Sequence, residues 1–189
     1  MLYKAGPLFA HLALMLALLV PGVSRAANEF VVQDLDCRME DGVFVLDAQI
    51  DYHFSEAALE ALENGVPLFT QVHLKLRRQN AWLWEKDYYT TQIRYRLQYQ
   101  AVAALYRVDE FHNNRWRDFA TLDGALEALG TIKSLPVAPE QLLEAGETYE
   151  VGIRTYLDVD ALPLPLRPIA YISPSWSLSS DWRSCVIRP

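Results

Sequence analysis

Three histidines are the first candidates for acid–base chemistry or metal binding in residues 28–189. They are His53, His73 and His112, and each lies in a separate segment. No pair has the spacing of a metal site, and the sequence contains no GxSxG nucleophile motif, phosphate-binding glycine loop or dinucleotide fingerprint. We therefore predict no enzymatic activity, no cofactor and no metal. Hydrolysis stays an alternative if a cleft brings His73 or His112 beside a carboxylate and a hydroxyl.

Two pairs of aspartates also have spacings that could serve chemistry. Asp47 and Asp51 share one face of an expected strand, but about 3.3 Å per residue separates them by roughly 13 Å, too far for a glycosidase pair. Asp158 and Asp160 form a DxD, a pattern that can bind a metal with a sugar nucleotide. Because they precede a proline-rich segment, where aspartate also forms turns, we interpret this DxD as structural.

A basic surface carries the main physical argument for binding. If residues 68–77 and 89–99 pair as an antiparallel hairpin, their polar side chains share one solvated face. The candidate binding residues on it are His73, Lys75, Arg77, Arg94 and Arg96. Two interpretations remain open. Asp47 and Asp51 on a neighbouring strand would make this an ordinary salt-bridged face, or the face would receive an acidic partner or a phosphate-bearing headgroup.

Four aromatic residues lie near the expected turn of the same hairpin. They are Trp82, Trp84, Tyr88 and Tyr89. They either pack into one end of the core or form an exposed tip that stacks on sugars or serves as a protein hot spot. Their burial distinguishes the two alternatives.

The sequence has two cysteines, Cys37 and Cys185, near the two ends of the expected domain. In an oxidising compartment this pair predicts a disulfide between the first and the last strand. Closing so long a loop would stabilise the fold by about 5 kcal/mol on the chain-entropy model. Two unpaired buried thiols are the alternative.

The first 27 residues have the pattern of a secretory signal peptide. Lys4 precedes an apolar stretch at residues 8–20, and a Pro21-Gly22 break and the small residues Ala26 and Ala27 follow. The apolar stretch is shorter than the roughly 20 residues of a membrane-spanning helix, although an uncleaved anchor is the alternative. We expect cleavage to leave residues 28–189 as a single β-rich domain with no stable membrane anchor.

Composition limits the class of protein. Of 189 residues, 51% are hydrophobic, and 17 Lys and Arg stand against 24 Asp and Glu, for a net charge of −7. These values exclude a disordered polymer and a polybasic nucleic-acid binder. We expect no nucleic-acid partner.

Alternating hydrophobicity predicts strands at 43–54, 68–77, 89–99 and 149–157, with shorter candidates at 30–37, 101–108 and 176–187. Short helices are expected after the caps Ser55 and Thr121 and from Pro139 to Gly146. The proline-rich segment 161–168 is expected to be extended at an edge or crossover. The pattern predicts an antiparallel β-sandwich-like domain with two or three short covering helices.

Several segments together resemble the bacterial domain-of-unknown-function family 4390. They are residues 62–68, 74–84, 95–99 with 106–108, 121–130 and 157–168. The resemblance implies a small exported protein in the periplasm of a Gram-negative bacterium, with a signalling partner such as a membrane sensor histidine kinase. It implies no catalytic residues. The expected function is a non-enzymatic interaction module, with lipid or glycan binding as the alternative.

Overall fold

The computed structural model describes residues 30–79 and 89–189. The predicted signal peptide, residues 1–27, lies outside the described residues, as do Trp82, Trp84 and Tyr88. No helix within the described residues is long and apolar enough to cross a membrane.

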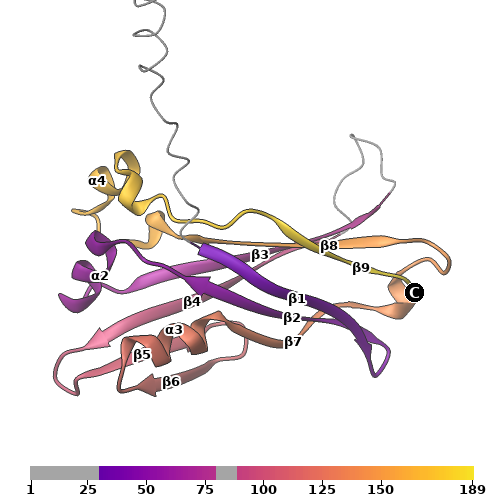
Figure 1. Ribbon diagram of the computed structural model, residues 1–189, viewed down its shortest axis with the longest axis horizontal. Coiled ribbons are helices and arrows are strands. Elements are labelled where there is room, and N and C mark those ends of the chain that lie inside the picture. The colour runs from indigo at the N-terminus through magenta and orange to yellow at the C-terminus, as the bar shows by residue number, and fades with distance from the viewer. Residues whose placement is uncertain (1–29, 80–88) are drawn as a thin grey trace, which may run out of the picture.

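Two antiparallel sheets form the body of the protein, as predicted (Figure 1). A three-stranded sheet has the order β1 (Phe30–Glu40), β2 (Val43–Tyr52) and β7 (Thr131–Pro139). A six-stranded sheet has the order β6 (Arg115–Phe119), β5 (Leu105–Glu110), β4 (Tyr89–Gln100), β3 (Leu68–Arg78), β8 (Tyr149–Leu157) and β9 (Arg183–Ile187).

The core lies between the sheets and follows the predicted alternation. In β2 the even positions are buried, and in β8 the odd ones are, including Tyr149 and Ile153. The register pairs Leu74 of β3 with Ile153, so the inward rows of neighbouring strands meet. Tyr89, one of the four aromatic residues near the expected turn, does not pack into the core: its side chain is 48% exposed at the start of β4.

Three short helices gather at one end of the sandwich (Figure 1). They are α2 (Glu56–Glu63), α3 (Leu122–Gly130) and α4 (Arg167–Ile172). The predicted caps are confirmed: Ser55 Oγ accepts from Ala58 N at 3.3 Å, and Thr121 Oγ1 accepts from Gly124 N at 3.2 Å. Helix α3 connects the two sheets and packs against β2, β5 and β6.

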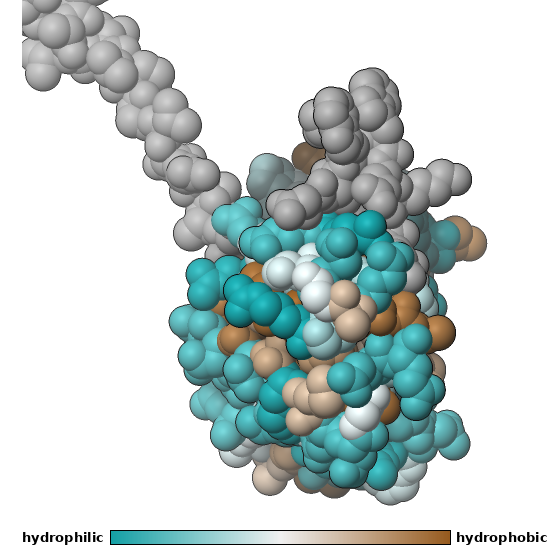
Figure 2. Space-filling view, turned by 90° about the vertical axis from the view of Figure 1, so that its right-hand side faces the viewer, coloured by the Kyte–Doolittle hydropathy of each residue, from teal (hydrophilic) through white to brown (hydrophobic). Residues whose placement is uncertain are grey.

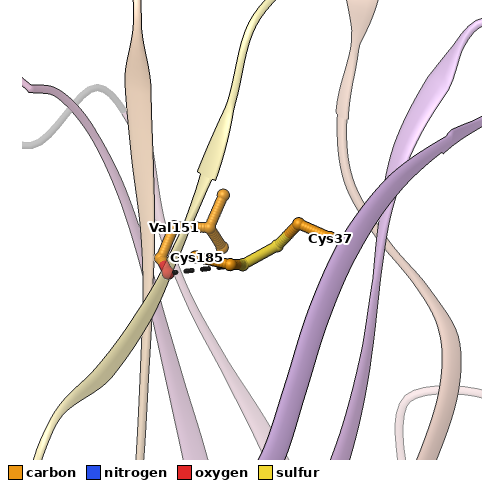
Figure 3. Close-up of a disulfide and its surroundings, with 3 residues drawn as sticks. All are labelled: Cys37, Val151 and Cys185. Carbon is orange, nitrogen blue, oxygen red and sulfur yellow. Dashed lines mark hydrogen bonds between the residues drawn. A yellow bond between two sulfur atoms is a disulfide. The ribbon is translucent and has the colours of Figure 1, made fainter.

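A disulfide between Cys37 of β1 and Cys185 of β9 ties the edge strands of the two sheets together (Figure 3). The Cα atoms lie 6.0 Å apart, and the cysteines are separated by 148 residues. The Cys185 sulfur lies 3.8 Å from the Val151 carbonyl oxygen of the adjacent strand (Figure 3). The predicted pairing is therefore present, and it closes one side of the sandwich.

The proline-rich segment corrects the sequence prediction. It was expected to be extended, but a turn in which Leu166 N donates to the Pro163 carbonyl at 2.9 Å leads directly into α4. Pro168 lies in the first turn of that helix, where a backbone donor has no partner to lose. Single 3₁₀ turns precede and follow, at Val159–Ala161 and Pro174–Trp176.

Three other expectations need correction. Residues 101–104 form a turn rather than part of a strand, so the predicted strand at 101–108 is replaced by β5. Pro139 ends β7, and only the 3₁₀ turn Glu140–Leu142 follows, rather than a helix starting at Pro139. In the expected strand at 176–187, only β9 is a regular strand.

Figure 2 shows the molecule from the end opposite the helices, where hydrophilic residues surround hydrophobic ones. A hollow of about 260 Å³ lies between the start of β4 and the end of β7, with Leu76, Tyr89, Val137 and Leu142 among its lining residues. Tyr89, the one described member of the predicted aromatic tip, belongs to this hollow.

Candidate interaction surface

The face of the six-stranded sheet that turns away from the three-stranded sheet is called the outer face here. The register of β3 and β4 places Gln71 opposite Arg94 and His73 opposite Gln92. Side chains at these positions alternate with the buried row, so they point outward. The structure thus brings all the predicted basic residues to one face: His73, Lys75, Arg77, Arg94 and Arg96.

Acidic side chains pair with the arginines of this face. Arg96 Nε donates to Asp109 at 2.8 Å across the β4–β5 ladder. Arg107 Nε donates to Asp118 at 2.7 Å across β5–β6.

Two further ion pairs link strands of this face. Arg77 binds Glu150 at 2.8 Å across β3–β8, and Arg94 binds Asp158, just after β8, at 2.8 Å.

These partners differ from the acids that the sequence suggested. Asp47 and Asp51 belong to β2 in the other sheet. Asp47 accepts from Arg38 at 2.6 Å, and Asp51 accepts from Gln33 at 2.8 Å. The outer face is therefore salt-bridged, which is the first of the two interpretations given above. The acids, however, come from β5, β6 and β8 with the residue that follows it, not from β2.

Aromatic rings lie beside the same cations. The Arg107 guanidinium lies 4.3 Å from the centre of the Trp116 ring, and Arg96 lies 5.7 Å from that of Phe111. Lys75 Nζ lies 4.9 Å from the Trp182 ring centre. Cation–π attraction of this kind orients the cation and the ring together.

We call this set the arginine–aromatic surface. It consists of Phe69, Arg94, Arg96, Arg107, Phe111 and Trp116. Phe69 and Phe111 stack with ring centres 6.3 Å apart, and Arg94 lies 5.8 Å from the Phe69 ring centre. Phe111 and Trp116 are 50% and 59% exposed, so apolar area on this surface meets solvent.

Two carboxylates on this face, Asp118 and Glu150, have a pKa below the ordinary value. The hydrogen bond from Arg107 lowers the pKa of Asp118 below its ordinary value. A side-chain hydrogen bond from Ser184 lowers the pKa of Glu150, and the bond from Arg77 lowers it further. The face therefore presents paired charges of both signs rather than a positive field.

The remaining candidates lie apart from one another. Asp158 is 5% exposed and accepts from Gln71 and Arg94, whereas Asp160 accepts from the Tyr171 hydroxyl, so the DxD carboxylates have different partners. Across residues 30–79 and 89–189, no cluster of three or more His, Cys, Asp and Glu could hold a metal ion.

The three histidines are also separated. The His73 ring lies 5.6 Å from that of Trp182, the His112 ring lies 5.7 Å from that of Tyr95, and His53 is exposed.

Sequence reasoning missed the aromatic members and the acids. Phe69 shares the solvent-facing row of β3 with Gln71 and His73, which was the available sign that its ring lies on the outer face. Phe111 and Trp116 lie at and beyond the β5–β6 turn, a hairpin too short and too polar to show alternation.

No curated protein and no solved structure matches the chain. The model of the family described as "Domain of unknown function (DUF4390)" matches residues 27–185, which is most of the chain. The protein therefore belongs to the DUF4390 family.

Proposed function

We propose that this protein is an exported, non-enzymatic interaction module that binds a protein partner through its arginine–aromatic surface. The observation that carries the proposal is the exposure of Phe111 and Trp116 beside ion-paired arginines on a regular sheet face. Trp, Tyr and Arg are the residues most enriched among binding hot spots, and their contribution grows when a partner excludes water from them.

The ion pairs support a protein partner rather than a polyanion. Arg94, Arg96 and Arg107 each have a carboxylate at 2.7 to 2.8 Å, so the surface offers donors and acceptors together. A polyanion would have to displace those carboxylates. A protein surface of mixed charge can match both signs and gain specificity from doing so.

Compartment and partner are part of the proposal. The N-terminal sequence pattern and the family resemblance support a periplasmic location. The same resemblance supports a membrane sensor histidine kinase as the partner, with its extracytoplasmic segment facing this protein.

Binding of the purified protein to that kinase segment, measured by biolayer interferometry, tests the proposal. The double variant Arg96→Ala with Phe111→Ala should weaken binding by about 10-fold or more, because truncating one hot-spot residue costs at least about 1 to 2 kcal/mol. The matched control is Met39→Ala with Arg188→Ala, which removes one exposed apolar residue and one exposed arginine elsewhere. Equal affinities of the two double variants, or no binding by the unsubstituted protein, would contradict the proposal.

A further inference from the structure

A cleft of about 560 Å³ lies where β6 of the six-stranded sheet faces β7 of the three-stranded sheet. Both are edge strands, and they belong to different sheets. The disulfide closes the opposite side, between β1 and β9, so this is the open side of the sandwich. The volume lies within the range of roughly 300 to 1,000 Å³ that is usual for small-molecule sites.

The charges in this cleft are unbalanced. Arg115 and Arg117 line it from β6 and Lys133 from β7, whereas Glu110 is its single acidic lining residue. The two Glu110 oxygens are already engaged: Oε1 accepts from Arg117 at 3.0 Å and Oε2 from Asn113 at 2.7 Å. The formal charge of these lining residues is positive in a chain whose net charge is −7.

Arg115 and Lys133 differ from the arginines of the outer face. Among the described residues, neither forms an ion pair within 4.0 Å. The positive charge of Lys133 contributes to lowering the pKa of Asp47, but the Asp47 carboxylate is bound by Arg38 at 2.6 Å. Arg115 and Lys133 are therefore two exposed cations on opposite walls of one cleft, and neither is ion-paired with a carboxylate of the described residues.

Groups that suit a polar ligand are among the remaining lining residues, which also include His112, Asn113, Ile132 and Leu135. Tyr95 comes from the floor of the six-stranded sheet, and burial raises the pKa of its hydroxyl, which stays a neutral donor. Asn114 and Thr131 add an amide and a hydroxyl, and Trp116 adds an exposed ring.

We propose that this cleft binds a small dianion, a dicarboxylate or a phosphorylated compound, whose two charges bridge Arg115 on one wall and Lys133 on the other. Charge-assisted hydrogen bonds to guanidinium and ammonium groups are the strong contacts available to such a ligand. Bound there, it would link the two sheets on the side that the disulfide leaves open. Trp116 is shared with the arginine–aromatic surface, but Arg115 and Lys133, which would bind the dianion, are not part of that surface.

The full protein, purified from the bacterial envelope, is titrated with inorganic phosphate and with succinate at constant ionic strength, and acetate serves as the singly charged reference. Binding is followed by backbone and arginine side-chain NMR shifts. We expect at least one dianion to bind saturably with a Kd of about 1 mM or lower, with shifts centred on β6 and β7. A response to phosphate alone, to succinate alone or to both identifies the anionic group that the cleft accepts.

Arg115→Gln and Lys133→Gln test the bridge separately, and each should weaken dianion binding by about 10-fold. Arg183→Gln is the matched control, since it removes another exposed arginine outside the cleft and should leave the Kd unchanged. The proposal is overturned if no probe binds saturably, if acetate binds as well as the dianions, or if the cleft variants bind like the control. The cleft variants are also tested for kinase binding. If they lose dianion binding but still bind the kinase segment, the two proposals succeed or fail independently.

Discussion

Arg94 and Asp158 form an ion pair at 2.8 Å in which the two members differ sharply in exposure. The arginine side chain is 49% exposed, whereas that of the aspartate is 5% exposed. Gln71 Nε2 also donates to the same Asp158 oxygen. Arg94 thus has two roles: it neutralises a buried carboxylate and contributes to the arginine–aromatic surface.

The first prediction follows from that difference in exposure. Arg94→Ala should destabilise the fold by about 2 kcal/mol or more, because it leaves the buried Asp158 charge with only neutral donors. Arg77→Ala should cost less than about 1 kcal/mol, since Arg77 is 59% exposed and its partner Glu150, at 24%, still contacts solvent. Urea unfolding of both variants measures the difference, and equal losses would refute this account of Arg94.

The second prediction concerns the disulfide. Replacing both Cys37 and Cys185 by alanine should lower the free energy of unfolding by up to about 5 kcal/mol, because the open chain regains the entropy of a long loop. Reduction of the unsubstituted protein should give a similar loss, and the double variant should not respond to reductant. A variant as stable as the oxidised protein would show that the bond does not hold the two edges together.

The third prediction concerns acid. A backbone hydrogen bond from Ser134 and the ion pair with Arg38 lower the pKa of Asp47. The folded state therefore binds this proton more weakly than the unfolded state, and the resulting stability is present above about pH 4 and is lost as pH falls further. Asp47→Asn should be less stable at neutral pH, with a gap that narrows toward about pH 2. Chemical unfolding at several pH values gives the gap, and a constant gap would contradict the assignment.

The fourth prediction concerns alkali. Burial raises the pKa of Tyr52 to about 12, while its hydroxyl lies 3.0 Å from Thr155 Oγ1. The unfolded chain ionises near pH 10, so the stability from a neutral Tyr52 is complete below that value and is lost between about pH 10 and 12. Tyr52→Phe should flatten the fall in stability over that range. An unchanged alkaline profile would refute the role of this hydroxyl.

The fifth prediction concerns the end of α3. A Cβ atom at Gly130 would overlap the Ile50 carbonyl oxygen, which is rigid backbone in β2. At Gly152 an added Cβ would lie 3.3 Å from the Trp182 ring, which is 41% exposed and can shift. Gly130→Ala should therefore lower the melting temperature much more than Gly152→Ala. The reverse order in a thermal melt would contradict the close approach of α3 to β2.

The sequence predicted best the strands that have one solvent-exposed face and one buried face. Strands β2, β3 and β8 alternate because one side packs in the core, and that period is visible in the sequence. β6 has no buried residue, and β7 contains Pro136 and a positive-φ Ser134, so neither shows a clean period. β7 is defined by its pairing with β2, which is distant in sequence, and β6 by its short hairpin with β5.

In the candidate site, contacts between strands adjacent in sequence were predictable, and contacts between distant strands were not. Local pairing of β3 with β4 was enough to bring Arg94 near Gln71. The acid that binds Arg94 comes from beyond β8, 64 residues later, and only the sheet order brings it close. The same holds for the dianion cleft, whose two walls come from different sheets.

Site-specific photo-crosslinking tests the central claim most directly. A photoreactive phenylalanine analogue replaces either Phe111, on the arginine–aromatic surface, or Met39, at 44% exposure on β1. Each protein is irradiated with the extracytoplasmic segment of a sensor histidine kinase, the proposed partner. We predict a crosslink from position 111 and none from position 39. No crosslink from 111, or equal yields from both positions, would contradict the assignment of the outer face as the partner-binding surface.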